Sequence, residues 1–259
     1  MPDRNLYPMI YKRKSYHLFR TAKSKQYFSV DHHISNEECD DIIRAFERFD
    51  RLYPDIKVAM RIAGNEDTTC ARGQEKVILL YSEEKDNCLM NIGYIGEQLD
   101  LYLASKNIGA LWFALNKNQM PDHEGLKYVI MIAICKVPED SFRKDMFKST
   151  RKPLEEIWHG EQLSGVSGIV RFAPSACNSQ PWIVEREGKK LAVYRYRNPK
   201  KKGVMPIEGT VIYNHIDIGI FLCFLELCLD HEGHTYKRKL FIDDKNEELN
   251  PVAVYQLNK

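Results

Sequence analysis

The chain has 259 residues, enough for one large domain or two of ordinary size. A formal net charge of +2 with 44% hydrophobic residues is typical of a globular protein and argues against nucleic acid or an anionic membrane as a partner. The apolar runs are too short for a bilayer span, the start lacks a secretory signal pattern, and seven cysteines show no paired spacing, so we expect a cytoplasmic protein with reduced thiols.

A basic segment comes first, from Met9 to Arg20. It carries four strong cations together with Ser15 and apolar anchors at Leu18 and Phe19. Cations and hydroxyls together satisfy phosphate oxygens, so the segment suits a phosphate-bearing ligand. A solvated surface turn is the alternative interpretation.

The rest of the first half alternates helices and strands. Ser35 and Glu38 form a capping-box pattern, which predicts a helix over residues 36–50. A long helix apolar on more than one face is expected over 91–107, with Gly109 at its C-terminal end. Strands are expected at 56–62, 77–81 and 128–137, the last of them central because it is apolar on both faces, with a polar loop at 63–73.

The second half starts after a charged stretch, 138–152, which reads as a linker. Short helices are expected at 153–159 and 163–172, and a long apolar helix at 214–230 that stops near Gly233. Strands are expected at 190–197, 240–243 and 252–257, with a turn at 200–203.

A polar loop, Ala173–Trp182, joins the second short helix to the following strand. It combines two prolines with serine, asparagine and glutamine side chains. Proline fixes the backbone, and the polar side chains offer hydrogen bonds in both directions, so such a loop could hold a flat polar ligand. An ordinary helix-to-strand connection uses the same residue types and is the alternative.

The two long helices suggest a weak internal repeat. Ile95-Gly96 in one matches Ile218-Gly219 in the other, and the order of neighbouring elements is similar. We therefore divide the chain into halves at residues 1–150 and 151–259.

Other candidate sites are poorly supported. His231 and His234 lack the further ligands that zinc requires. Cys177 lies in the polar loop, but no histidine is assigned to activate it. The two common phosphate loops and the Gly-x-Ser-x-Gly elbow are absent from the sequence. We name no catalytic residue and no metal site.

Four motifs resemble those of the FMN-dependent nitroreductase family. The polar loop is similar to the family's Pro-Ser-x-x-Asn-x-Gln-Pro-Trp signature, and Arg13–Phe19 to its Arg-Arg-Ser-x-Arg-x-Phe opening, with Lys14 and His17 as departures. Arg151–Glu156 resembles the closing Arg-x-Pro-x-Glu-Glu run, and Asn107–Trp112 resembles Gly-Leu-Gly-x-x-Trp. The signature lies after the closing run instead of before it.

That order resembles the fused, two-lobed branch of the family. The resemblance implies an α+β fold with three α/β/α layers, in which two related halves form an internal pseudo-dimer. It implies one FMN per chain, because Ile62–Glu66 stands where the first half would carry its own Pro-Ser loop. The residues it assigns to FMN are Arg13, Lys14, Ser15, His17, Leu111, Trp112, Arg151, Lys152, Pro174, Ser175, Ala176, Asn178 and Gln180.

The implied activity is transfer of a hydride from NAD(P)H through flavin N5 to an electron-poor acceptor such as a nitroaromatic or quinone. The alternatives are an ene-reductase or dehalogenase on the same fold, or a flavin-binding protein without enzymatic activity. We expect a monomer whose partners are small molecules. The choice between NADH and NADPH is left open, because the sequence shows no nucleotide motif.

Overall fold

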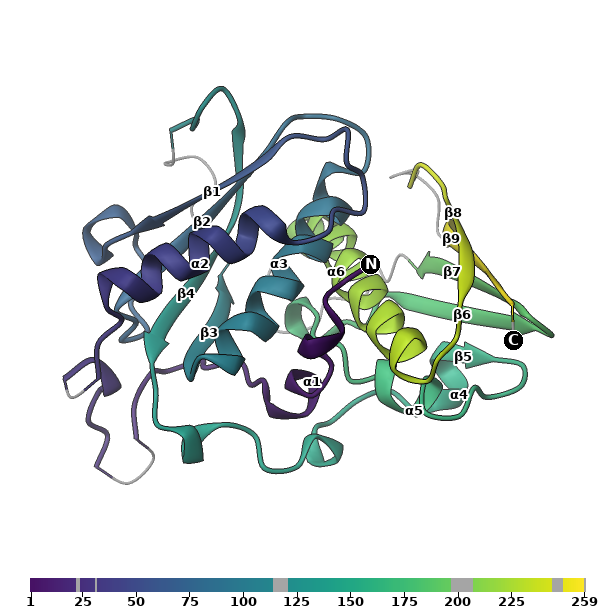
Figure 1. Ribbon diagram of the computed structural model, residues 1–259, viewed down its shortest axis with the longest axis horizontal. Coiled ribbons are helices and arrows are strands. Elements are labelled where there is room, and N and C mark those ends of the chain that lie inside the picture. The colour runs from purple at the N-terminus through teal and green to yellow at the C-terminus, as the bar shows by residue number, and fades with distance from the viewer. Residues whose placement is uncertain (22–23, 31, 114–120, 197–206, 244–248, 259) are drawn as a thin grey trace.

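Two mainly antiparallel sheets are built from the two halves of the chain in matching order (Figure 1). The computed structural model describes residues 1–259 except 22–23, 31, 114–120, 197–206, 244–248 and 259. The expected turn at 200–203 lies outside the described residues.

The first sheet has the strand order β1-β2-β4-β3, all antiparallel. Strand β4 is interior and almost wholly buried, which confirms the prediction of a central strand there. The strands of the first sheet are β1 (Val58–Ala63), β2 (Lys76–Ser82), β3 (Ile108–Phe113) and β4 (Lys127–Lys136).

The second sheet has the order β5-β6-β7-β9-β8, with β5 added in parallel at the edge. Strand β6 was not predicted, and β8 lies before the predicted 240–243. In both strands, more exposed positions alternate with less exposed ones, because the outer face of the sheet is exposed to solvent. The strands are β5 (Trp158–His159), β6 (Trp182–Glu187), β7 (Lys190–Tyr196), β8 (Tyr236–Leu240) and β9 (Leu249–Leu257).

The three long helices, α2, α3 and α6, are confirmed. The two short helices, α4 and α5, are shorter than predicted. The Ser35 hydroxyl and the Glu38 carboxylate form the expected capping box at the start of α2. Helix α6 is followed by Gly233 at φ 73°, the expected stop. The helices are α1 (Met9–Lys12), α2 (Asn36–Arg48), α3 (Cys88–Ser105), α4 (Leu154–Ile157), α5 (Ser167–Val170) and α6 (Ile207–His231).

One helix end was predicted wrongly. Gly109 lies inside β3 and does not end α3; the left-handed residue after that helix is Asn107, at φ 57°. A Cβ on Gly109 would come within 2.8 Å of the Tyr16 ring, so this glycine allows the basic segment to approach β3.

The two halves share one strand order. Strands β1, β2, β4 and β3 occupy the places that β6, β7, β9 and β8 occupy in the other sheet, and α3 and α6 each follow the second strand of the set. The segment before β1, residues 49–57, therefore corresponds to the polar loop before β6. The interpretation of Ile62–Glu66 as the missing Pro-Ser loop was wrong, because its first two residues end β1.

Helices α3 and α6 pack against each other at the centre of the molecule (Figure 1). A Cβ on Gly93 would lie 2.0 Å from the carbonyl oxygen of Ile216, and a Cβ on Gly219 would lie 1.9 Å from that of Met90. Each glycine thus contacts the residue three positions before the other glycine. This reciprocity pairs Gly93 with Gly219, so the alignment of Gly96 with Gly219 was wrong by three residues.

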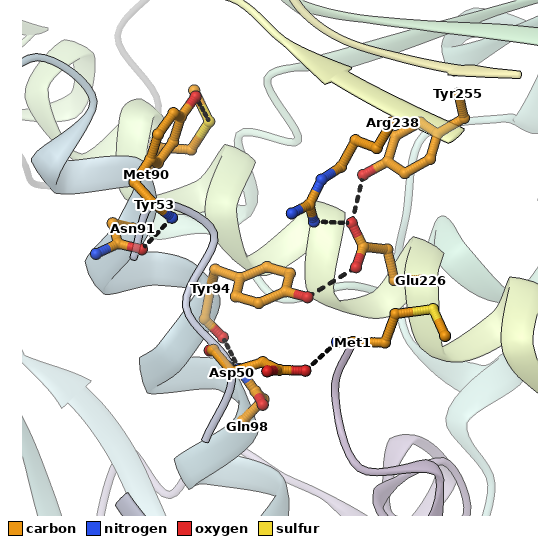
Figure 2. Close-up of polar contacts among 10 residues, drawn as sticks. All are labelled: Met1, Asp50, Tyr53, Met90, Asn91, Tyr94, Gln98, Glu226, Arg238 and Tyr255. Carbon is orange, nitrogen blue, oxygen red and sulfur yellow. Dashed lines mark hydrogen bonds and ion pairs between the residues drawn. The ribbon is translucent and has the colours of Figure 1, made fainter. Parts of the chain in front are cut away.

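The sheets lie on either side of this helix pair. One apolar cluster joins α2, α3 and α6 to the inner faces of both sheets, and a second covers the other face of the first sheet. The α+β class is confirmed, whereas the layers run sheet, helices, sheet across the molecule instead of the expected α/β/α order (Figure 1). Within the core, Glu226 of α6 accepts hydrogen bonds from the Tyr94 and Tyr255 hydroxyls at 2.7 and 2.8 Å and pairs with Arg238 at 2.5 Å (Figure 2).

Helix α6 includes a stretch, Ile212–His231, that is long and apolar enough to cross a membrane. Its most apolar window is 89% buried inside the protein. Because α3, α5 and β7 of the second sheet pack against it, its composition is that of a core helix.

Candidate functional site

Hydrogen bonds join three segments that are distant in sequence: the basic segment, residues 138–152 (the strap) and residues 173–181 (the Pro-Ser loop). The strap holds the basic segment through Ser141 and Arg143. The Arg143 amide donates to the Lys12 carbonyl at 3.2 Å, and Lys14 Nζ donates to the Ser141 carbonyl at 3.0 Å.

The strap also holds the Pro-Ser loop. Lys152 donates from its amide to Gln180 Oε1 and from Nζ to the Gln180 carbonyl, both at 2.9 Å. Arg151 donates to Asn178 Oδ1 and to the Phe172 carbonyl, both at 3.1 Å. The charged stretch predicted to be a linker therefore joins the first and last of the three segments.

Strand β3 lies beside the basic segment. Ser15 bridges to Ala110 in parallel, and the Tyr16 amide donates to the Ala110 carbonyl at 3.0 Å. Because β3 is at the edge of its sheet, this contact brings the backbone of Leu111 and Trp112 close to the basic segment.

Arg13 is buried and bound internally. Its Nε and Nη2 lie 3.1 and 3.0 Å from Asp100 Oδ2, which also accepts from Trp112 Nε1 at 3.1 Å. Burial alone would lower the pKa of Arg13, but Asp100 and Glu97 raise it. Burial and the charge of Asp100 raise the pKa of Glu97 well above its usual range, so Asp100 is the main counter-ion of Arg13.

Three further arginines belong with Arg13: Arg143, Arg151 and Arg171, of which Arg151 is close enough to the other three to feel their charges. Burial, then Arg13, lowers the pKa of Arg143 to about 10. Burial, followed by the charges of the other three, lowers the pKa of Arg151 to about 10. We call these four residues the arginine cluster. In the described part of the chain, carboxylates form ion pairs with Arg13 but not with the other three.

Two guanidinium nitrogens of the cluster are buried without a hydrogen-bond partner, Nε of Arg151 and Nε of Arg171. An unpaired buried donor is costly, and a set of like charges adds to the cost. Such an arrangement favours binding of an anion with several acceptor oxygens, above all a phosphate.

The Pro-Ser loop has a strained backbone. Cys177, Asn178 and Gln180 have φ values of 50°, 53° and 47°, a region that non-glycine residues seldom adopt. The buried Asp217 of α6 accepts from the Ala176 amide at 2.9 Å and from the Ser179 hydroxyl at 3.3 Å. The loop is thus held by α6 as well as by the strap.

Most of the residues predicted to bind a cofactor lie near this junction. Pro174 is buried, and Ser175 and Ala176 are half-buried, while the polar groups of Asn178 and Gln180 contact the strap. His17 is exposed. Sequence reasoning missed Arg171 and Asp217, and it named Arg143 only as part of a linker.

Other candidate positions lie elsewhere. Among the described residues, no group of three or more His, Cys, Asp and Glu side chains is arranged to hold a metal, and the ring of His231 stacks on Tyr7 at 3.7 Å. A hollow of about 280 Å³ is lined by charged residues such as Glu185 and Arg186 of the second sheet. None of the residues predicted to bind a cofactor lines this hollow.

The resemblance of the four motifs to nitroreductases reflects membership of a family. Residues 5–229 match the family model described as "Putative TM nitroreductase". The chain belongs to this nitroreductase family. A search of curated proteins found no match.

The fold is shared with a solved structure from Thermotoga maritima. A nitroreductase from Thermotoga maritima has 18% identity to this chain and a TM-score of 0.59, with 98% of this chain and 94% of that one covered. A Desulfovibrio desulfuricans nitroreductase in complex with FMN has 18% identity and a TM-score of 0.41, covering 61% of this chain and 97% of its own. A protein from Clostridium acetobutylicum described as an NADH oxidase has 16% identity and a TM-score of 0.42, covering 60% and 99%.

Proposed function

We propose that this nitroreductase family member is an FMN-dependent oxidoreductase that passes a hydride from NAD(P)H to an electron-poor acceptor such as a nitroaromatic or quinone. The observation that carries the proposal is the arginine cluster at the junction of the basic segment, the strap and the Pro-Ser loop. It combines excess positive charge with buried, unpartnered donors beside the family's signature loop.

The residues present fit the phosphate end of FMN. A phosphate monoester has a charge of about −1.5 to −2 at neutral pH and three acceptor oxygens. It would supply partners for the buried Nε atoms of Arg151 and Arg171 and offset their repulsion with Arg143. Arg13 is held by Asp100, so in this proposal it adds positive charge and orients Ser15, whose Oγ accepts from its Nη2 at 3.2 Å.

The remaining predicted residues would surround the ring system and ribityl chain. Ser15 and the backbone of Leu111 and Trp112 approach from the first half, and Pro174 to Ala176 from the second. Lys14 and Lys152 add positive charge at the two ends of the strap, and Asn178 and Gln180 keep the loop against it. His17 would contact the flavin only from the exposed rim.

Bound at this junction, FMN would supply the hydride-accepting and hydride-donating chemistry between NAD(P)H and the acceptor. The chain's own part is to bind, orient and shield the group. The backbone of the β3 edge strand beyond Ala110 can present amide donors to the ring edge, which would favour the reduced, more negative flavin. This role needs no acid or base side chain.

One FMN per chain is expected. The first-half segment that corresponds to the Pro-Ser loop, residues 49–57, has no serine, asparagine or glutamine. The matching strand orders support an internal pseudo-dimer in which each half contributes a different part of a single site. We accordingly propose a cytoplasmic monomer that acts on small molecules.

Anaerobic stopped-flow spectroscopy tests the activity. The FMN-loaded protein mixed with NADH or NADPH should lose its flavin absorbance rapidly, and a nitroaromatic or quinone should restore it. A protein that binds FMN but is reduced by neither nucleotide would be a flavin-binding protein, and the oxidoreductase proposal would fail. Reduction that only an enone or a halogenated substrate reverses would indicate an ene-reductase or dehalogenase instead.

A further inference from the structure

The Pro-Ser loop and the equivalent segment of the first half are attached to the core helices in the same way. In the second half, Asp217 Oδ1 accepts from the Ala176 amide at 2.9 Å. In the first half, Asn91 Oδ1 accepts from the Tyr53 amide, also at 2.9 Å (Figure 2). Asn91 and Asp217 each lie two residues before the reciprocal glycines Gly93 and Gly219, so they are structural counterparts.

The two counterparts differ in chemistry. Asn91 offers one acceptor oxygen, whereas the Asp217 carboxylate offers two. The second oxygen, Oδ2, accepts from the Ser179 hydroxyl at 3.3 Å, and that hydroxyl also lies 3.1 Å from Asn214 Oδ1. The carboxylate thus contacts the loop on both sides of two of its strained residues, Cys177 and Asn178, at Ala176 and at Ser179.

The loop needs such support. Three left-handed non-glycine residues within four positions cost on the order of 1–3 kcal/mol each, so the conformation persists only where surrounding contacts enforce it. The Ser175 hydroxyl helps by accepting from the Gln180 amide at 3.0 Å, and the strap holds Asn178 and Gln180. Of these supports, Asp217 belongs to the rigid central helix pair.

Burying a carboxylate at this position also costs free energy. Asp217 is buried, and burial raises its pKa to about 7 against the hydrogen bonds from Ala176 and Ser179, which lower it. In the first half, a neutral amide accepts the same backbone hydrogen bond without that cost. A buried acid at this position therefore indicates a function beyond stability of the fold.

We propose that Asp217 is a positioning residue for the flavin site, with its two carboxylate oxygens fixing the strained Pro-Ser loop in the conformation that receives the cofactor. This inference rests on the proposed function for its cofactor part. The positioning of the loop itself stands on the apoprotein's own contacts. Asp217 acts through the loop backbone and not by touching the flavin.

The test compares Asp217→Ala, which removes both acceptors, with Asp217→Asn and Ser179→Ala, which each leave the Ala176 contact. Asn91→Ala is the matched control, because it removes the equivalent contact in the half without the loop. Hydrogen exchange of peptides covering residues 173–181 is measured in the full-length apoprotein, and FMN affinity is measured by fluorescence titration.

We expect exchange at Ala176 to accelerate about 10- to 100-fold in Asp217→Ala, the range for loss of a hydrogen bond to a charged group. Asp217→Asn and Ser179→Ala should show much smaller changes, and FMN affinity should fall in the same order. Asn91→Ala should leave both quantities at the wild-type level. Unchanged exchange in Asp217→Ala, or an equal effect of Asn91→Ala, would overturn the inference. If the wild type binds no FMN, the proposed function fails, and the exchange result still decides the role of Asp217.

Discussion

Gly93 and Gly219 meet where the two central helices cross, and each one faces a backbone carbonyl of the other helix. The nearest oxygen would lie 2.0 Å from a Cβ on Gly93 and 1.9 Å from a Cβ on Gly219. Real Cβ atoms do not approach oxygen so closely, so any side chain would separate the helices. The close packing of the halves therefore depends on both positions remaining glycine.

Substituting either glycine by alanine should destabilise the protein strongly. We expect Gly93→Ala or Gly219→Ala to lower the free energy of unfolding by about 3 kcal/mol or more, at the upper end of overpacking costs. Urea denaturation would measure this. Gly168→Ala is the control, because no atom lies within 4 Å of its Cβ position on α5, and it should be neutral or stabilise by up to about 1 kcal/mol. Similar effects at all three positions would show that the crossing is not tightly packed.

Arg143 offers a test of the arginine cluster. Arg143→Gln should weaken FMN binding by about 1.5–3 kcal/mol, the value of a hydrogen bond to a charged group, because the substitution removes a cation from the proposed phosphate site. The melting temperature of the apoprotein should not fall, since the same substitution relieves repulsion with Arg13 and Arg151. Fluorescence titration and thermal unfolding provide the two readouts. Arg44→Gln, at an exposed pair on α2, should change neither, and equal losses of affinity in both variants would argue against a phosphate at the cluster.

Asp100 should be essential for stability because it neutralises the buried Arg13. Asp100→Asn leaves a buried guanidinium without its main counter-ion, which typically costs about 3–5 kcal/mol. The double variant Arg13→Met/Asp100→Asn should recover much of that loss. Chemical denaturation of the two single variants and the double variant measures the coupling. Strictly additive effects would mean that the two side chains do not interact.

Stability should decrease as pH rises toward 7 because of Asp217. Its pKa is about 7 in the folded protein and near 3.8 when unfolded, so between these values the folded state holds a proton that the unfolded state has released. This contribution to the free energy of unfolding falls by at most about 1.4 kcal/mol per pH unit across that window and is constant above it.

Asp217→Asn removes this titration and supplies the matching variant. It should be more stable than the wild type at pH 8 and should differ less from it at pH 5. Denaturant midpoints at the two pH values check the sign. A difference between the proteins that is independent of pH would show that Asp217 keeps an ordinary pKa.

Several elements could be predicted because local signals determine them. The capping box at Ser35 and Glu38 defines the start of α2, and the continuous apolar run of β4 requires burial on both faces. Strand β6 was missed because only its first half is apolar; its second half is Glu185, Arg186 and Glu187, and both glutamates are exposed. Gly109 was misassigned because a glycine after a helix resembles a C-terminal cap, whereas here it makes room for Tyr16.

The candidate site was predictable only where a motif is continuous in sequence. The Pro-Ser loop and the basic segment could be identified in this way. Arg143 and Arg171 could not, because their place in the cluster depends on the path of the strap and on the end of α5. Asp217 reads as one polar residue on an apolar helix, and its importance becomes visible only through its contacts with Ala176 and Ser179.

Titration of the apoprotein with FMN, followed by flavin fluorescence, tests the central claim most directly. The account predicts saturable binding of one FMN per chain, weakened by loss of Arg143 and unaffected by loss of Arg44. Absence of binding, or two equivalent sites per chain, would contradict it.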